Sequence, residues 1–455
     1  MASSKKLRHG ELAATLATFL KQTVPAGQRL LLGLSGGLDS RVLLHLLANL
    51  REDFDFDLAA LHVNHGISPH AEAWQQFCLD VCKCYNIPCT AQRVNIPRDS
   101  DEGLEAAART ARYAVLLSET VDYVVLAHHQ DDQAETLLLQ LLRGAGVKGV
   151  AAMQRLAMRD QLSTSSKQPK PIGLLRPLLD ISRSTLAAYA KEHQLKWIED
   201  ESNLDLSYGR NFLRHQLFPE LELRYPACRS TLARSAAHLA EAAELLDEVA
   251  RIDADLWVRQ GRLDLAGLRP MSEPRAKNLL RHWLSIHLPS LPSTRRLQDI
   301  CHQLLDARPE AMIAIPLAGG CVRRYRDEAW FESAGGVSGP GSLQWQGEDE
   351  LLFCNGRLRF RQSTGGGISL GRLAGEALII RLRKGGERLR LHPDGPSRSL
   401  KNLFQEAGVP AWQRVTQPLM FWRDELVAMP GIGVASAWQA APGEAGLLVA
   451  WQPEV

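Results

Sequence analysis

Two groups of residues in this sequence have the types and spacing for phosphate and metal chemistry. The first is Ser35-Gly36-Gly37-Leu38-Asp39-Ser40, between an apolar run and a helix-like stretch. Glycine lets a phosphate approach the backbone, and N–H groups at a helix N-terminus attract anions. The second group is Asp131, Asp132 and Glu135. A carboxylate repels bound phosphate unless a cation such as Mg²⁺ lies between them. The two groups therefore predict a phosphate site with Mg²⁺ beside it, held by carboxylates.

Each group also has a simpler interpretation. The loop is an ordinary strand-to-helix turn if nothing binds there, since it has neither a lysine after its second glycine nor the G-x-G-x-x-G spacing. Acids in a first helical turn are favoured by the helix dipole alone. What supports the functional interpretation is that the two groups occur together.

The elements that must position these residues follow from the apolar pattern. Near-continuous apolar runs at 30–34, 57–63 and 123–127 predict buried strands, and periodic stretches at 71–84 and 103–117 predict helices. Alternating strands and helices indicate a parallel sheet, whose ligands bind at the carboxyl ends of the strands. Three polar clusters follow the strand ends: 35–39, Asn64-His65, and 128–132.

Three further sets of residues are candidates with open alternatives. Arg109 and Arg112 contact a phosphate, or lie on a solvated helix face with a Glu105–Arg109 pair. His128 and His129 are metal ligands, or structural hydrogen-bonding groups. The third set consists of Cys78, Cys82, Cys84 and Cys89. These cysteines lack a C-x-x-C spacing, and this absence favours buried free thiols over a metal site.

Composition narrows the class of protein. The chain has 455 residues, which predicts two or three domains, and its net charge of +2 does not by itself indicate nucleic-acid binding. There is no apolar run long enough for a membrane span, and the N-terminus lacks the apolar region of a secretory signal. Eight cysteines in so long a chain favour a reducing, cytoplasmic setting.

The composition changes along the chain. We predict an α/β nucleotide-binding domain with a parallel sheet over 1–216, a mainly helical domain over 217–335, and a small α+β domain over 370–455. A basic stretch in the last domain is either a solvated face or a surface for a phosphate backbone. The candidate residues for such a surface are Arg383, Lys384, Arg388 and Lys401.

Taken together, the motifs resemble a known family. The loop 35–40 is similar to the PP-loop of N-type ATP pyrophosphatases, and further motifs narrow the resemblance to the tRNA(Ile)-lysidine synthase family. These motifs are Leu61–Pro69, His128–Thr136, Arg176–Leu179, Trp197–Asn203, Tyr208–His215, Leu382–Arg388 and Lys401–Phe404. The resemblance is densest over 30–215 and weakest over 240–370.

The resemblance implies an ATP-dependent ligase. Such enzymes adenylate C2 of the wobble cytidine in the CAU anticodon of tRNA(Ile), and free L-lysine then displaces AMP to give lysidine. By resemblance, residues Ser35, Gly36, Gly37, Leu38, Asp39 and Ser40 bind ATP. Asp39, Asp132 and Glu135 hold Mg²⁺, Arg109 contacts the reacting phosphate, and the two later domains bind the tRNA.

Two competing functions stay open at this point. A related PP-loop enzyme such as a tRNA thiolase would need paired cysteines, and a tRNA-binding scaffold that has lost catalysis would show a damaged loop or damaged acids. The sequence leaves the lysine-binding residues, the rejection of methionine tRNA, and the oligomeric state undetermined, with a homodimer as one candidate assembly.

Overall fold

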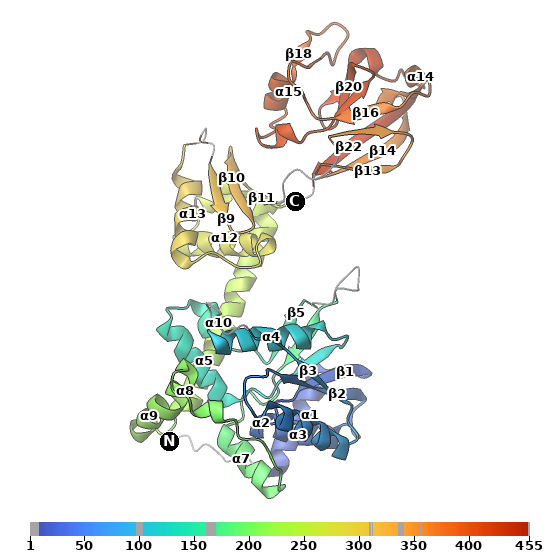
Figure 1. Ribbon diagram of the computed structural model, residues 1–455. Helices are drawn as coiled ribbons and strands as arrows, with labels where there is room; N and C mark the ends of the chain where they lie inside the picture. Colours follow the sequence, from blue (N-terminus) through green and yellow to red (C-terminus); the bar gives the residue numbers. More distant parts are fainter. Residues whose placement is uncertain are drawn as a thin grey trace. The chain divides into compact units, whose positions relative to one another are not determined.

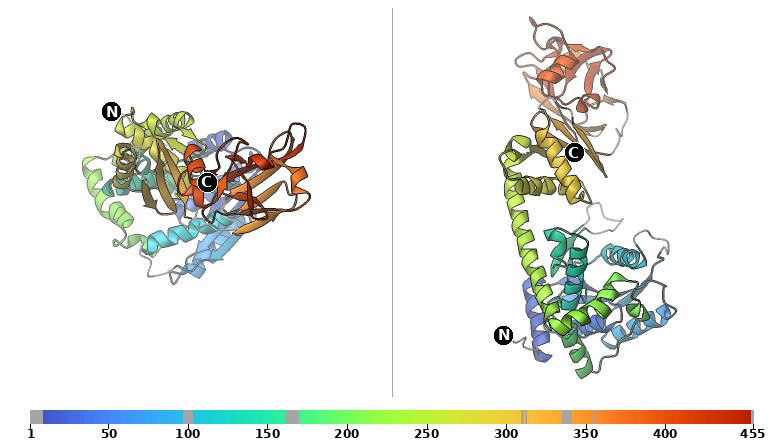
Figure 2. Two further views of the ribbon diagram at one scale, coloured as in Figure 1. Left: turned by 90° about the horizontal axis from the view of Figure 1, so that it is seen from above. Right: turned by 90° about the vertical axis from the view of Figure 1, so that its left-hand side faces the viewer.

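A computed structural model describes residues 9–96, 103–160, 170–308, 311, 313–334, 341–354 and 356–453 (Figure 1). The chain divides into two compact units, Met1–Leu246 and Asp247–Val455. The long helix α10 (Cys228–Trp257) begins in the first unit and ends in the second, and Figure 2 shows it as one continuous helix. The predicted boundaries at 216/217 and between 335 and 370 stay predictions, and residues 335–340 lie outside the described part.

The first unit is built on a six-stranded sheet in the order β3-β2-β1-β4-β6-β5. β3, β2, β1, β4 and β6 pair in parallel, and β5 pairs antiparallel with β6 at the edge of the sheet. The strands are β1 (Gln28–Gly33), β2 (Phe56–Asn64), β3 (Cys89–Arg93), β4 (Tyr123–Val125), β5 (Leu156–Arg159) and β6 (Ile172–Leu175). The parallel sheet predicted from the sequence is confirmed.

Helices cover both faces of this sheet (Figure 1). Leu30 and Leu32 point into a core shared with α1, α2, α3 and α7, whereas Leu31 points into a core shared with α4. A strand buried on both faces is apolar without alternation, as the sequence of β1 is. The helices are α1 (His9–Thr23), α2 (Leu38–Leu50), α3 (Ala71–Cys84), α4 (Leu104–Ser118) and α7 (Arg183–Glu192).

The rest of the first unit is helical and packs beside the carboxyl ends of the strands. α5 begins directly after the polar cluster that follows β4, and the later segments return to it through a small apolar core around Ala134 and Phe218. These elements are α5 (Gln130–Leu142), α6 (Val147–Val150), a 3₁₀ turn (Glu201–Leu204), α8 (Gly209–Phe212), a π-helical segment (Leu213–Leu217) and α9 (Phe218–Arg224).

The second unit contains a core around Trp283, with helices and a five-stranded antiparallel sheet. The prediction of a mainly helical region is therefore incomplete here. Its elements are β7 (Val258–Arg259), β8 (Arg262–Asp264), α11 (Leu265–Leu268), α12 (Glu273–His287), α13 (Thr294–Asp306), β9 (Ala314–Leu317), β10 (Gly320–Tyr325) and β11 (Glu328–Ser333).

A second core in this unit, around Phe404 and Phe421, supports the predicted α+β region. It packs a five-stranded and a four-stranded sheet with two short helices. The elements are β12 (Ser342–Trp345), β13 (Glu350–Phe353), β14 (Gly356–Thr364), β15 (Ile368–Ser369), α14 (Leu370–Leu373), β16 (Leu378–Arg381), β17 (Arg388–Leu389), β18 (Arg398–Ser399), α15 (Leu400–Glu406), β19 (Leu419–Trp422), β20 (Glu425–Met429), β21 (Gly433–Val434) and β22 (Ala445–Pro453).

Some short elements have no clear signal in the sequence. β5 and β6 have four residues each, too few to show a period of two. β10 and β11 form a hairpin whose turn contains Arg326 at φ 55°, a left-handed conformation that arginine rarely adopts.

A ring cluster between α2 and α7 contains a histidine that stays neutral. The His45 Nδ1 atom lies 2.9 Å from the Tyr189 hydroxyl, and the His45 and His193 ring centroids are 4.9 Å apart. Burial, together with the positive charges of His193 and Arg41, lowers the pKa of His45 to about 4.

We expect His45→Gln to reduce the loss of stability in acid. Because the folded-state pKa of about 4 lies below the ordinary histidine pKa of 6.5, the unfolded chain binds more protons between these values, and stability falls as the pH drops through this window. Denaturant unfolding at several pH values measures the slope. His238→Gln, at an exposed position on α10, is the control and should retain the original slope. Equal slopes in the two variants would contradict the prediction.

Candidate active site

The loop between β1 and α2 is closed by its own hydroxyl groups. Ser35 Oγ lies 3.0 Å from Ser40 Oγ and accepts a hydrogen bond from the Gly37 N–H at 3.3 Å. Ser40 Oγ donates to the Gly37 carbonyl at 3.1 Å. The first turn of α2 follows at once, with Asp39 in it. This is a compact loop at a helix N-terminus, an arrangement that binds phosphate.

The segment around Ile198 lies directly against the loop. The Ile198 N–H donates to the Gly36 carbonyl at 2.9 Å. Gly36 has φ +84°, and a Cβ atom there would lie 2.5 Å from Ile198 Cδ1 and 3.0 Å from Cys78 Sγ. Only glycine fits this position, for reasons of both backbone conformation and space.

His129 joins two of the predicted carboxylates. Its Nε2 atom lies 3.5 Å from Asp39 Oδ2 and 3.6 Å from Asp132 Oδ2. His129 is also the N-cap of α5, and the Asp132 carboxylate accepts the His129 backbone N–H at 3.0 Å. Burial opposes the charged imidazole, but Asp132 and Asp39 outweigh it and raise the pKa of His129. The structure thus brings Asp39 and Asp132 together through a histidine.

Two arginines from α8 and the π-helical segment hold Asp132 and Glu135. Arg214 donates to both Glu135 oxygens, at 2.7 and 2.9 Å. Arg210 donates to Glu135 Oε2 at 2.7 Å and to Asp132 Oδ1 at 2.8 Å. Glu135 is fully buried and Asp132 is 8% exposed. Burial alone would raise the pKa of Asp132, but the charges of His129 and Arg210 hold it well below its usual range.

The ion pairs of Glu135 with Arg210 and Arg214 concern one of the three predicted metal ligands. Both Glu135 oxygens accept hydrogen bonds from guanidinium groups, so Glu135 is the counter-charge of Arg210 and Arg214. No group of three or more candidate ligands suited to a metal ion occurs among the described residues. Asp39 Oδ1 differs, because it is buried and has no hydrogen-bond partner.

The two arginines of α4 face different surroundings. Arg109 is exposed, and its guanidinium lies 5.2 Å from the Tyr113 ring centroid. Arg112 has a buried Nε atom without a hydrogen-bond partner, and its pKa is lowered by burial. Asp132 and Arg210 are both close enough to act on it electrostatically. Arg112 therefore lies within electrostatic reach of the Asp132 cluster. The Glu105 side chain lies outside the described part, so the Glu105–Arg109 pair stays a prediction.

Two histidines at the strand ends also have unused ring nitrogens. The Nδ1 atoms of His65 and His128 are buried and make no hydrogen bond. Burial and the Arg112 charge lower the pKa of His65 to about 4, and burial lowers the pKa of His128 well below its usual value. Both imidazoles are neutral, with a nitrogen available to a ligand.

Sequence reasoning assigned no separate role to Arg210, Arg214 or His65. Each occurred within a quoted motif, and the spacing of Arg210 and Arg214 places them on one helix face. Their partners are 75 or more positions away in the sequence, so only the tertiary structure shows the contacts.

The basic residues of the second unit are solvent-exposed. Arg383, Lys384, Arg388 and Lys401 all lie on the surface. The backbone N–H groups of Lys384 and Gly385 donate to Glu387, at 2.5 and 2.9 Å, which fixes the turn between β16 and β17.

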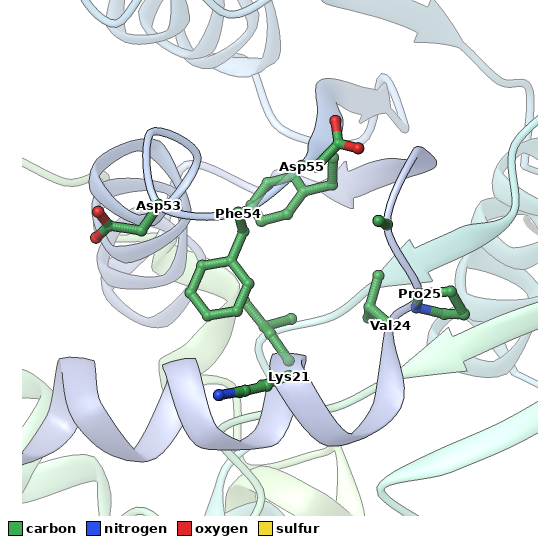
Figure 3. Close-up of a pocket in the computed structure, with 9 residues that line it drawn as sticks. Lys21, Val24, Pro25, Asp53, Phe54 and Asp55 are labelled. Carbon is green, nitrogen blue, oxygen red and sulfur yellow. The ribbon is translucent and has the colours of Figure 1, made fainter.

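Other features do not add to this site. A hollow of about 460 Å³ near Lys21 and Phe54 lies at the amino ends of β1 and β2, the opposite edge of the sheet (Figure 3). All eight cysteines are free thiols. A search of the described helices found none that is both long and apolar enough to span a membrane.

Comparison with known families gives three matches along the chain. A PP-loop domain model matches residues 9–221, a TilS substrate binding domain model matches 263–330, and a TilS substrate C-terminal domain model matches 378–451.

Full-length relatives are similar throughout. The tRNA(Ile)-lysidine synthase of Nitrosomonas europaea is 44% identical over 456 residues, covering 100% of this chain and 98% of the relative. The tRNA(Ile)-lysidine synthase of an Azoarcus species is 41% identical, covering 97% of this chain and 96% of the relative.

We expect Gly36→Ala to destabilise the first unit by about 1–3 kcal/mol, as overpacking and a strained backbone do. Gly37→Ala is the matched control, because Gly37 has φ −70° and its nearest neighbour to a new Cβ is Ser35 Oγ at 3.5 Å. Thermal unfolding without ligands compares the two variants. A Gly37 variant as unstable as the Gly36 variant would contradict this explanation.

We also expect Glu135→Gln to cost about 3–5 kcal/mol of folding free energy, because it removes the fully buried one of the two carboxylates that pair with Arg210 and Arg214. Glu376→Gln breaks an exposed pair with Arg423 whose closest atoms are 2.6 Å apart, and it should change stability little. Denaturant unfolding measures both variants. A small effect at Glu135 would show that the buried network does not hold α5 to the segment 209–217.

Proposed function

The chain belongs to the tRNA(Ile)-lysidine synthase family, and we propose that the PP-loop and the Asp39–His129–Asp132 cluster form its reaction centre. The protein is a tRNA(Ile)-lysidine synthase, an ATP-dependent ligase that modifies tRNA. The observation that carries the proposed site is the meeting of Asp39 and Asp132 at His129, beside the loop at the carboxyl edge of the sheet.

The ATP phosphates bind at the loop Ser35–Ser40. The turn presents backbone N–H groups at the start of α2, where the helix dipole favours negative charge. The hydroxyls of Ser35 and Ser40 already bond within the loop, which keeps the backbone in place before ATP arrives. Such preorganisation reduces the cost of ordering the site.

The residues present fit a Mg²⁺ ion. The buried Asp39 Oδ1 atom lacks a partner, and carboxylate oxygens are preferred Mg²⁺ ligands. Asp39 and Asp132 would hold the ion, which when bound neutralises charge on the phosphates as pyrophosphate leaves. Glu135, the third predicted ligand, acts through Arg210, which bridges it to Asp132.

The chemistry proceeds in two displacements. The O2 atom of the wobble cytosine attacks the α-phosphorus of ATP and pyrophosphate leaves, which gives an adenylated base. The lysine ε-amine then attacks C2, the C–O bond breaks, AMP leaves, and the amine loses a proton. Arg109, on the exposed side of α4, contacts the reacting phosphate in this scheme.

The two substrate-domain regions bind the tRNA. Exposed basic residues at 383, 384, 388 and 401 suit the phosphate backbone, whose contacts dominate affinity.

We place the enzyme in the cytoplasm, where tRNA, ATP and free lysine occur together. A homodimer stays a prediction. The chain is similar over its full length to tRNA(Ile)-lysidine synthases, which favours this function over the thiolase and scaffold hypotheses.

The proposal is tested by incubating the protein with ATP, Mg²⁺, labelled lysine and a CAU-anticodon tRNA(Ile) transcript. We expect lysine to enter the tRNA with release of AMP and pyrophosphate. Asp39→Asn should lower the rate by at least about 10²-fold, since it removes a charge from the reaction centre. Asp394→Asn, in the second unit, is the control for folding and charge.

No incorporation by the unaltered protein would refute the activity. Full activity of the Asp39 variant would refute the assigned site while leaving the activity intact.

A further inference from the structure

Two cysteines meet where α3 ends and β3 begins, at the amino end of that strand. Cys82, in the last turn of α3, is fully buried, and Cys89, the first residue of β3, is partly exposed. The chain reverses between them, because the Cys82 carbonyl accepts the Ile87 N–H at 3.0 Å. β3 then pairs with β2, with Cys89 opposite Ala60. Both cysteine side chains therefore pack against the same apolar core.

The two thiols interact directly. The Cys82 thiol donates a hydrogen bond to the Cys89 sulfur. Because this bond keeps the proton on Cys82, it raises the pKa of Cys82 and lowers the pKa of Cys89. A thiolate is the reactive form of cysteine, so the more exposed sulfur is the better nucleophile. The buried sulfur lies beside it as a second thiol.

A buried guanidinium near the pair favours a negative charge on it. Arg41 is 8% exposed, and its Nη2 atom donates to the Tyr85 hydroxyl at 3.1 Å. The Nε and Nη1 atoms of Arg41 are buried and have no hydrogen-bond partner. The Arg41 charge acts on the Cys82 thiol and favours its ionised form. Because a buried positive charge is costly without a counter-charge, a thiolate in this pair and the guanidinium stabilise each other.

We propose that Cys82 and Cys89 form a redox-active pair, which hydrogen peroxide closes to a disulfide and a thiol reductant opens again. The Cys89 sulfur attacks one peroxide oxygen, the O–O bond breaks, and one water is released, which leaves a sulfenic acid on Cys89. The Cys82 sulfur then attacks the Cys89 sulfur. The S–S bond forms, the S–O bond breaks, and the departing hydroxide takes the Cys82 proton to give a second water.

The disulfide acts on the PP-loop through α3, a step that rests on the proposed function. Cys78 lies one helical turn before Cys82, and a Cβ atom on Gly36 would be only 3.0 Å from the Cys78 Sγ atom. Cys78 is fully buried, and close-packed interiors transmit strain. Closing a covalent bridge at the end of α3 therefore disturbs the contact of Cys78 with the loop, and ATP binds less tightly.

Peptide mapping tests whether the bridge forms. The reduced full-length protein is treated with hydrogen peroxide, its free thiols are alkylated in denaturant, and it is digested with trypsin. Trypsin cleaves after Lys83, so the bridge joins the peptide that ends at Lys83 to the peptide that contains Cys84 and Cys89. We expect these two peptides to be joined, with Cys78 and Cys84 alkylated, and dithiothreitol to separate them.

Kinetics tests whether the bridge acts on the PP-loop. After peroxide treatment we expect the ATP KM for tRNA-dependent pyrophosphate release to rise about 5-fold or more, as coupling between two sites does, and to recover with dithiothreitol. Cys82→Ala and Cys89→Ser should lose both the bridge and the rise, while their reduced forms keep the unaltered ATP KM. Cys84→Ser is the matched control at a neighbouring exposed thiol, and it should behave as the unaltered protein.

Three outcomes overturn the proposal. Without a joined peptide from the unaltered protein, the two cysteines are not a redox pair. An equal rise of the ATP KM in the Cys82 and Cys89 variants would place the sensitive group elsewhere. An unchanged ATP KM in the bridged protein would refute the action on the PP-loop. Failure of the proposed function is distinguishable from all three, because the reduced protein would then incorporate no lysine, whereas peptide mapping requires no activity.

Discussion

The reaction centre depends on one buried set of ion pairs. Asp132 and Glu135 lie on the first turns of α5, and Arg210 and Arg214 reach them from a segment 75 or more positions later. Glu135 has no exposed surface, so its charge is tolerable only because two guanidiniums surround it. This network fixes the carboxylate edge of the site and joins α8 and the π-helical segment to α5, beside the apolar core around Ala134 and Phe218.

The network also sets what Asp132 can do. With one oxygen bonded to Arg210 and the other beside His129, Asp132 stays ionised, because its pKa lies well below the usual range. Asp39 meets the same histidine from the PP-loop. Two carboxylates at one imidazole repel each other less when that imidazole is protonated, which agrees with the raised pKa of His129. The protein thus assembles two acids beside a phosphate loop while limiting their repulsion.

The sequence predicted the sheet and the edge of the site well, because apolar runs and strand-end clusters are local signals. The short strands β5 and β6, and the turn at Arg326, lack such signals and were not predicted. The roles of individual residues within the site were harder to predict from the sequence. Glu135 has the residue type of a metal ligand, and only its contacts with Arg210 and Arg214 show that it pairs with two guanidiniums. Likewise, sequence spacing does not distinguish the exposed Arg109 from the inward Arg112.

Pairing distinguishes structural charges from those that wait for a ligand. Every buried polar group must be satisfied by protein, water or ligand, so an orphaned atom is informative about binding. Asp39 Oδ1, His65 Nδ1, Arg112 Nε, His128 Nδ1 and Arg176 Nε are all orphaned. Asp39, His65, His128 and Arg176 follow strands of the sheet at their carboxyl ends, and Arg112 comes from α4. Because no protein group bonds to these atoms, they are placed to bind polar groups of water or of the substrates, whereas the Glu135 carboxylate serves the fold.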